Sequence, residues 1–197
     1  MAELVRLFIV TLVFSAFSGG LLATLNETLE ERIAYQEVKF VKGPAIQQVM
    51  EGSSNDPLVD SFKLKDGDEE RSFFIGVFDG KPNVVAFETY GKGYDGNIGV
   101  IVGVNVDNDE IVGVSVTTHT ETPGVGARVK TDPAFGSQFK GLSAKDPVKT
   151  RTDGGQVDAI SGASFSSKGV VSAVNDAEDI YKRLKTEIMQ KMKSSKT

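Results

Sequence analysis

The first part of the chain is apolar over a length that is sufficient to cross a bilayer. Residues Leu7 to Leu25 carry no charge, and Arg6 and Glu27 bound this run. A helix of this length measures roughly 28 Å at about 1.5 Å per residue, close to the ~30 Å thickness of membrane hydrocarbon. The pattern therefore predicts a single transmembrane helix over residues 1–25.

A cleavable signal peptide is the alternative, because it also begins with a basic residue followed by an apolar stretch. A retained anchor is favoured, since the run exceeds the usual ~7–15 apolar residues of a signal peptide and no Ala-x-Ala sequence follows it. Arg6 precedes the span and acidic residues follow it, so the positive-inside rule predicts a cytoplasmic N-terminus. We expect a single-pass protein of the cytoplasmic (inner) membrane with an extracytoplasmic, periplasmic domain.

Segments rich in β-branched and aromatic residues occupy the middle of the chain and predict two antiparallel hairpins. Short stretches rich in Asp, Asn and Gly, residues 79–83 and 107–110, separate the members of each pair and supply the turns. We expect a sheet of at least four strands. The paired segments are Ser72–Phe78 with Val84–Tyr90, and Ile98–Val106 with Ile111–Thr118.

The C-terminal part of the chain changes to a helical period, with apolar residues every three or four positions and charged residues between them. Strands followed by a long helix, without regular βα alternation, indicate an α+β fold in which the helix packs on an antiparallel sheet. Residues 26–42 are expected to form a helical stalk that ends before Gly43-Pro44, which leaves 43–197 as the soluble domain. The apolar residues of the C-terminal helix are Val170, Val174, Ala177, Tyr181, Leu184, Ile188 and Met192.

The composition then excludes several kinds of metal site and cross-link. The 197 residues include no Cys and only one His, so iron–sulfur clusters, cysteine zinc sites, disulfides and multi-histidine metal centres are excluded within the chain. Carboxylate sites for hard cations remain open. The net charge of −5 argues against nucleic-acid binding, which depends on neutralising phosphates with Lys and Arg.

The sequence Gly91-Lys92-Gly93-Tyr94-Asp95-Gly96 satisfies the GxGxxG pattern of dinucleotide-binding proteins. That fingerprint must open a helix whose N–H groups bind the pyrophosphate, whereas a strand is predicted directly after Gly96. We therefore interpret this segment as a glycine-rich turn between two strands.

Two loops concentrate residues that suit a ligand. The segment Thr117–Gly126 contains four threonines, the single His119 and two glycines, and its alternative interpretation is an ordinary turn. The segment Asp153–Lys168 places four serines directly before the long helix. If Ser166 or Ser167 caps that helix, its free N–H groups form an anion site beside Ser164; the alternative is that these serines only cap a helix.

A serine hydrolase is a further alternative. The sequence Gly162-Ala163-Ser164-Phe165-Ser166 is similar to the nucleophile elbow GxSxG but lacks its last glycine, and His119 would have to act as the base.

Three segments together resemble a known family. HTETPGVG, GYDGNIGVIVGV and DAISGASFSS are similar to segments in the FMN-binding domain of the G subunit of Rnf ion-translocating ferredoxin:NAD oxidoreductase complexes. The related C subunit of Na⁺-translocating NADH:quinone oxidoreductase shares the pattern. The resemblance covers roughly residues 1–190 and includes the N-terminal span.

The resemblance implies a covalent cofactor. In the family, a flavin transferase attaches FMN by a phosphoester bond to a motif of the form Asp-x-x-Ser/Thr-Gly-Ala-Thr/Ser, which here runs from Asp158 to Ser164. Ser164 is the expected acceptor, although Thr is the commoner family residue there. His119 is expected either to bond the flavin or its loop, or to serve as a structural hydrogen-bonding residue. The expected cofactor-binding residues are His119, Glu121, Thr122, Gly124, Val125, Asp158, Ser161, Gly162, Ala163, Ser164 and Lys168.

The leading hypothesis is a membrane-anchored electron carrier with covalent FMN. It works with other membrane subunits of an Rnf-type complex that couples ferredoxin–NAD electron transfer to Na⁺ or H⁺ translocation. By this hypothesis the chain is not catalytic alone, has no catalytic residue and no metal site, and is a subunit of an oxidoreductase (translocase). The alternatives are an anchored structural or assembly module, whose serine-rich loop only caps a helix, and the serine hydrolase.

Overall fold

The computed structural model describes residues 1–194, with side chains for all of these except residues 30, 31, 34 and 35. The chain forms two compact units, Met1–Lys39 and Phe40–Thr197.

The first unit is one long helix, α1 (Ala2–Glu37). Within Ala2–Leu29, the most apolar 18 residues have a mean hydropathy of 2.0 and none of them is buried, so the helix is long and apolar enough to cross a membrane. The predicted apolar N-terminal helix is confirmed. A helix with no protein covering its apolar side chains needs another apolar environment, and a bilayer provides one.

Helical structure does not stop at Gly43-Pro44, where the sequence predicted an end. A π-helical stretch, η1 (Val38–Lys42), leads directly into α2 (Gly43–Val49). Pro44 lies in the first turn of α2, directly after the π-helical stretch, and it lacks the N–H that an uninterrupted α-helix would use, so the change of helix type falls at this point.

A five-stranded antiparallel sheet in the order β1-β2-β3-β4-β5 forms the centre of the second unit. Both predicted hairpins are present, as β2–β3 and β4–β5, and β1 is an additional strand at one edge. The turn between β2 and β3 is tight because Asp79 and Gly80 both adopt positive φ angles, of 52° and 71°. The strands are β1 (Ser61–Asp66), β2 (Glu69–Phe78), β3 (Lys81–Lys92), β4 (Asn97–Asn105) and β5 (Glu110–Val116).

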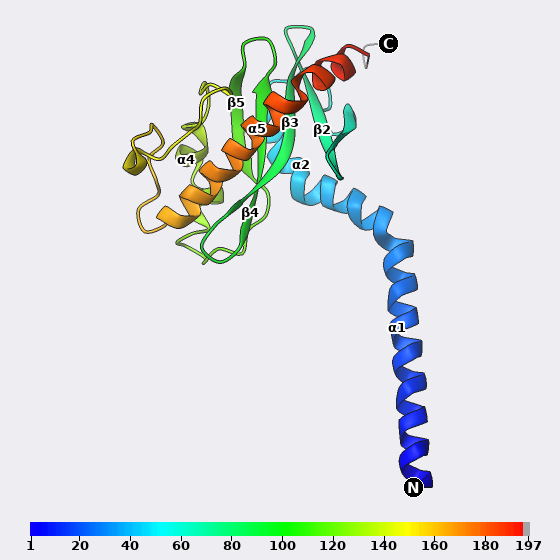
Figure 1. Cartoon of the computed structure of the whole chain (residues 1–197). Coiled ribbons are helices and arrows are strands. Elements are labelled where there is room, and N and C mark those ends of the chain that lie inside the picture. Colours follow the sequence, from blue (N-terminus) through cyan, green and yellow to red (C-terminus); the bar gives the residue numbers. More distant parts are fainter. Residues whose placement is uncertain (195–197) are drawn as a thin grey trace. The chain divides into compact units, whose positions relative to one another are not determined.

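Helices cover both faces of this sheet (Figure 1). On one face lies α5 (Ser164–Ser194), and the Thr89 hydroxyl donates a hydrogen bond of 2.8 Å to the Ala173 carbonyl of that helix. On the other face lies α2, where a Cβ at Gly103 would be 2.5 Å from the Val49 side chain. The interior of β4 is therefore buried on both sides, whereas the sequence pattern indicated only one apolar face.

The remaining elements are short and lie in the loops after β5. They are α3 (Arg128–Thr131), α4 (Pro133–Ser137) and the 3₁₀ turn η2 (Arg151–Asp153). The fold is α+β, with an antiparallel sheet, packed helices and one apolar helix at the N-terminus, as the sequence predicted.

Candidate flavin site at the start of the C-terminal helix

The expected acceptor, Ser164, is the first residue of α5. The sequence predicted that the helix starts near Ser167, with Ser166 or Ser167 as its cap, and this was wrong by about one turn. Ser164 is exposed, and its hydroxyl takes part in no hydrogen bond among the residues that the structure describes. The free N–H groups of the first turn therefore lie at Ser164 itself.

The two buried serines, Ser166 and Ser167, form hydrogen bonds within the protein. The Ser167 hydroxyl donates to the Ala163 carbonyl at 2.9 Å and accepts from the Ile160 N–H at 3.0 Å. The Ser166 hydroxyl donates to a carboxylate oxygen of Glu121. These contacts fix the segment that precedes the helix and leave Ser164 as the available hydroxyl.

Glu121 joins three segments that are far apart in the sequence. Its side chain is buried, with 4% of the residue exposed, and its carboxylate also accepts the backbone N–H of Asp95 at 3.1 Å. Two glycines make room for it: a Cβ at Gly93 would be 2.3 Å from one carboxylate oxygen, and a Cβ at Gly126 would be 2.6 Å from the other. The glycine-rich turn, the Thr117–Gly126 loop and the start of α5 therefore meet at this carboxylate.

A second close approach holds the helix against the sheet. A Cβ at Gly91 would be 1.9 Å from the Gly169 carbonyl oxygen, so no larger residue fits at this crossing of β3 and α5. The chain then turns at Gly93–Gly96, closed by a 2.7 Å backbone hydrogen bond, and continues as β4. This confirms that the GxGxxG sequence is a turn between strands.

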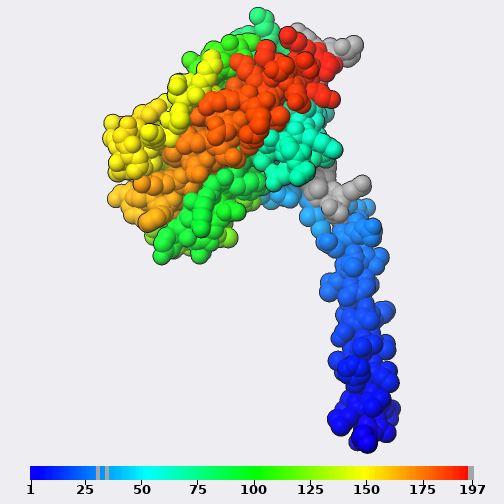
Figure 2. All heavy atoms as spheres, in the orientation of Figure 1, coloured from blue at the N-terminus to red at the C-terminus, as the bar shows by residue number. Residues whose placement is uncertain are grey.

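Aromatic rings surround the start of α5. Phe165 and Tyr94 are 69% and 74% exposed, and their ring centroids are 6.2 Å apart. Val125 is also exposed, at 47%. Figure 2 shows the surface of the β3–β4 turn region (green) beside the first turns of α5 (orange). Exposed apolar side chains that gather at one place mark a candidate contact surface for a ring or a partner.

Comparisons with known proteins give the family to which the chain belongs. Residues 93–179 match the FMN-binding domain family. The G subunit of the ion-translocating oxidoreductase complex of Methanosarcina acetivorans is 33% identical over 179 residues, which cover 90% of this chain and 94% of that protein. The G subunit from Vibrio cholerae is 32% identical over 176 residues, with 84% of each chain covered. The chain belongs to the G-subunit family of ion-translocating oxidoreductase complexes.

A solved structure supports the fold. The chain matches the crystal structure of the C subunit of the Na⁺-translocating NADH-quinone reductase from Parabacteroides distasonis with a TM-score of 0.59 and 22% identity, over 76% of this chain and 94% of that one. The region that matches the FMN-binding domain family contains Tyr94, Glu121 and Ser164, which all belong to the site described above.

The signature segment, residues 158–164, is held by side chains from outside it. The Asp158 carboxylate forms a bidentate ion pair with Arg151, at 2.6 and 3.0 Å, and this pairing lowers the pKa of Asp158. Gln138, at the end of α4, bonds both the N–H and the carbonyl of Asp158, at 2.7 and 3.2 Å. Neither contact was evident from the sequence, because both partners lie in other segments: Arg151 is 7 residues before Asp158, and Gln138 is 20 residues before it.

Lys168 was expected to place its ammonium group beside a phosphate at Ser164. In the structure its Nζ lies 2.9 Å from an Asp153 carboxylate oxygen. Hydrogen bonds from Thr150 and then from Lys168 lower the pKa of Asp153. Lys168 lies one helical turn after Ser164 and is exposed, so it is close in sequence to the acceptor but already paired with an acidic residue.

The other expected residues line the same two loops. Thr122 turns the first loop, since its carbonyl accepts the N–H groups of Val125 and Ala127 at 3.2 and 3.1 Å. Gly124 and Gly162 have positive φ angles of 72° and 81°, and no heavy atom lies within 4 Å of the position that a Cβ would take at either residue. Ala163 is buried, whereas Ser161 is exposed.

His119 is half-buried, and its Nδ1 is a buried atom without a hydrogen-bond partner among the described residues. No hydrogen bond in the described part of the chain joins it to Ser164, so the pairing that a serine hydrolase needs is not formed.

The site fits FMN better than a metal. Residues 1–194 contain no group of three His, Cys, Asp or Glu side chains that could hold a metal ion, within the side chains described. The site instead offers an exposed hydroxyl at a helix N-terminus, open space at two glycines and exposed aromatic rings. These groups suit a phosphate ester that carries a planar ring.

Proposed function

We propose that this chain is a membrane-anchored electron-transfer subunit that carries FMN through a phosphoester bond to Ser164. It works in an Rnf-type complex that couples electron transfer between ferredoxin and NAD to the translocation of Na⁺ or H⁺. The observation that supports this assignment most directly is the exposed hydroxyl of Ser164, the first residue of α5, which lies next to two exposed rings and has no hydrogen bond among the described residues.

Attachment of FMN is a phosphoryl transfer to the Ser164 oxygen. A bond forms between Oγ and phosphorus, and the Oγ proton leaves. The phosphoryl donor is a flavin dinucleotide, whose pyrophosphate bond breaks and releases a nucleoside monophosphate. A dedicated flavin transferase catalyses this step, and it recognises the Asp158–Ser164 signature. The reaction consumes no electrons, so the flavin is attached without a change in its redox state.

The residues around Ser164 then hold the cofactor. The N–H groups of the first turn of α5 and the positive end of its dipole stabilise the phosphate ester. Glu121 keeps the Thr117–Gly126 loop against this turn through Ser166, so the loop stays beside the attachment point. The exposed rings of Tyr94 and Phe165 provide apolar surface for the flavin ring.

No residue of the chain needs to act as an acid, base or nucleophile in the electron transfer itself. Bound FMN supplies the redox chemistry, and the protein supplies position and electrostatic surroundings. Because the chain contains no Cys and one His, an organic cofactor is the form of redox group that suits it. A covalent bond keeps this cofactor in place between transfers.

The partners and the location follow from the same proposal. The partners are the other membrane subunits of the complex, which donate and accept the electrons. The anchor α1 is retained, its N-terminus lies in the cytoplasm, and the FMN domain lies on the opposite, periplasmic side of the cytoplasmic membrane. The basic residue before the span and the acidic residues after it support this orientation.

The test is co-production of the chain with a flavin transferase. The purified protein is expected to absorb near 450 nm, where oxidised flavins generally absorb, and Ser164→Ala is expected to be colourless. Ser172→Ala is the matched control and should keep the flavin, because Ser172 is also an exposed serine of α5 but lies outside the signature. Ser164→Thr should retain the flavin, since it keeps the accepting oxygen. Colour that survives in Ser164→Ala after denaturation and desalting contradicts the proposed attachment site.

A further inference from the structure

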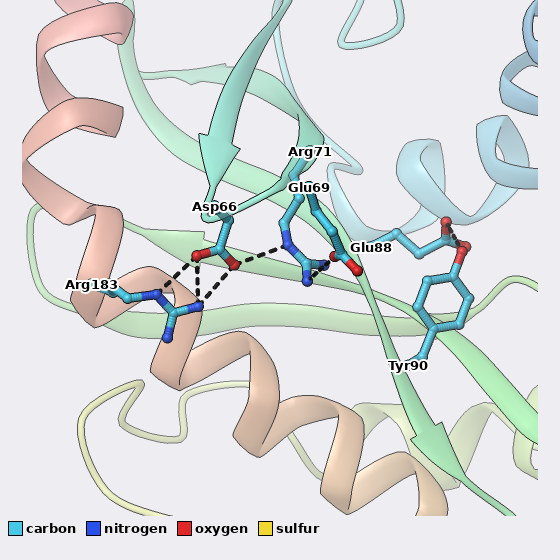
Figure 3. Close-up of polar contacts among 6 residues, drawn as sticks. All are labelled: Asp66, Glu69, Arg71, Glu88, Tyr90 and Arg183. Atoms are coloured by element: carbon cyan, nitrogen blue, oxygen red, sulfur yellow. Dashed lines mark hydrogen bonds and ion pairs between the residues drawn. The ribbon is translucent and has the colours of Figure 1, made fainter.

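A second carboxylate, Glu88, lies on the sheet face that α2 covers, away from α5. Its side chain is only 10% exposed, and it is surrounded by donors. Lys42 Nζ lies 2.9 Å from one carboxylate oxygen, and the Tyr90 hydroxyl donates to the same oxygen at 2.8 Å. The Thr117 hydroxyl donates to the other oxygen at 2.5 Å. Figure 3 shows Glu88 and Tyr90 side by side on β3.

The strand register places these groups together. Tyr90 and Gly99 are paired in the β3–β4 ladder, and the Thr117 N–H donates to the Gly99 carbonyl at 2.8 Å. Gly99 also leaves the necessary space. A Cβ there would lie 2.5 Å from the Thr117 hydroxyl oxygen and 3.1 Å from a Glu88 carboxylate oxygen. The absence of a side chain at Gly99 therefore allows Thr117 to reach Glu88.

The donors to Glu88 come from two functionally different parts of the chain. Lys42 is the last residue of η1 and lies three residues after the anchor unit ends at Lys39. Thr117 follows β5 and begins the loop that leads to Glu121. Thr117 is buried, and its carbonyl accepts a hydrogen bond of 2.6 Å from Lys130. One carboxylate therefore connects the junction segment Phe40–Lys42, where the chain from the membrane joins the domain, to the start of this loop.

We propose that Glu88 is a positioning residue that holds Thr117–Thr122, the first part of the Thr117–Gly126 loop, to the junction segment. This inference rests on the proposed function, because it assigns the Thr117–Thr122 loop to the flavin. A largely buried carboxylate needs compensating donors, so loss of the Lys42 charge leaves Glu88 poorly compensated. Glu88 then draws closer to solvent, and Thr117 loses its partner. In this way the attachment of the domain to its anchor sets the geometry of the loop that faces the cofactor.

Hydrogen exchange of the full-length chain in phospholipid nanodiscs tests the connection. Lys42→Met is expected to increase the amide exchange rates in both the junction segment and the Thr117–Thr122 loop by about ten-fold, equivalent to about 1.4 kcal/mol in local opening. Gly99→Ala would place a Cβ 2.5 Å from the Thr117 hydroxyl and 2.6 Å from the Thr118 hydroxyl, so it displaces the loop directly without changing Lys42 and gives the exchange rate expected of a displaced loop. Lys42→Arg retains the charge and should restore slow exchange.

Lys63→Met is the matched control, because Lys63 forms a 2.8 Å ion pair with Glu70 in which both side chains are mostly exposed. It should leave both segments unchanged. In flavin-loaded protein, Lys42→Met should also shift the visible circular dichroism of the flavin at unchanged flavin content, and Lys42→Arg should reverse the shift. Faster exchange confined to the junction segment overturns the proposal. If wild-type protein carries no flavin, the proposed function fails, whereas the exchange measurements still decide whether Glu88 connects the two segments.

Discussion

The two ends of α5 differ in how completely their polar groups are satisfied. In the C-terminal half of the helix, called its far end below, Tyr181 and Lys185 contact Asp109 of the β4–β5 turn. Asp109 is 6% exposed and accepts hydrogen bonds from the Tyr181 hydroxyl at 2.6 Å and from Lys185 at 2.5 Å, while Lys145 lies 2.6 Å away. Nearby, Asp66 pairs with Arg183 at 2.8 Å and with Arg71 at 3.1 Å (Figure 3). These contacts fasten the helix to the β4–β5 turn and to the β1–β2 hairpin.

At the first turn of the helix, the exposed groups have few partners. The Ser164 hydroxyl has no hydrogen bond within the described chain, and the rings of Phe165 and Tyr94 are mostly exposed. The polar groups that are buried there, Glu121 and Ser166, bond each other. The difference indicates that the far end of α5 stabilises the fold, whereas its first turn leaves a hydroxyl and two rings available to bind a ligand or a partner. Substitutions at the two ends should therefore separate stability from flavin binding.

The largest expected effect on stability is at the far end. Asp109→Asn removes the charge that Lys145 and Lys185 compensate, while Asn still tolerates the positive φ of 59° at this position. We expect a loss of about 3 kcal/mol in the free energy of unfolding at pH 7, because the buried Asp109 carboxylate loses its charge-assisted hydrogen bonds to the two lysines. Chemical denaturation measures this loss, and flavin attachment should be unaffected.

The pH dependence sharpens this prediction. Burial raises the pKa of Asp109, but hydrogen bonds from Lys145, Lys185 and Tyr181 outweigh it and lower the pKa well below its ordinary value of 3.8. The stabilisation is therefore present above pH 3.8 and is lost as the pH falls below it. The difference in stability between wild type and Asp109→Asn should shrink on acidification. A constant difference between about pH 7 and about pH 2 is inconsistent with this assignment.

Glu178 should have the next largest effect, with the opposite sign. It is 2% exposed, one carboxylate oxygen has no partner among the described residues, and burial raises its pKa to about 7. The folded state favours the protonated carboxyl of Glu178 over the charged one. The free energy of unfolding is therefore highest below the ordinary pKa of 4.5 and falls as the pH rises from there through 7.

Glu178→Gln removes this titration. At pH 8 the variant should be more stable than wild type by about 2 kcal/mol, less than the full shift implies because Gln still buries a polar group. Near pH 5 the two proteins should have similar melting temperatures. Equal stability at pH 8 would show that Glu178 is not destabilised by burial.

The smallest effect on stability is expected at the first turn. Phe165→Ala should change the free energy of unfolding by less than about 0.5 kcal/mol, since the ring is mostly exposed. In flavin-loaded protein, however, it should weaken the visible circular dichroism of the flavin. Val59→Ala is the matched control, because Val59 is 74% exposed and lies away from α5 in the sequence. If both variants leave the flavin signal unchanged, Phe165 does not contact the ring.

The regular parts of the fold were predictable because their patterns are local. The β2–β3 and β4–β5 hairpins and the long C-terminal helix follow from strand alternation, turn residues and helical spacing. Strand β1 was missed, since Ser61–Asp66 is short and carries two lysines and a terminal aspartate. The start of α5 was placed too late because serines usually cap helices, whereas here they serve tertiary contacts.

The candidate site was only partly predictable. The sequence identified both loops, and the structure joins them through Glu121 and Ser166, which are 45 residues apart. No sequence pattern gives such a pairing. The exposed ring pair was also missed, although aromatic residues beside a glycine-rich turn and beside the acceptor were a usable signal. The role of Ser164 stays a prediction, because it concerns a bond that forms in a separate reaction.

Peptide mass spectrometry tests the central claim most directly. Trypsin cleaves after Arg151 and Lys168, so the fragment of residues 152–168 contains the whole signature. In protein from cells that contain the flavin transferase, this fragment should gain the mass of FMN less one water, with the fragmentation series assigning the added mass to Ser164. An unmodified fragment, or an adduct on another residue, would contradict the account.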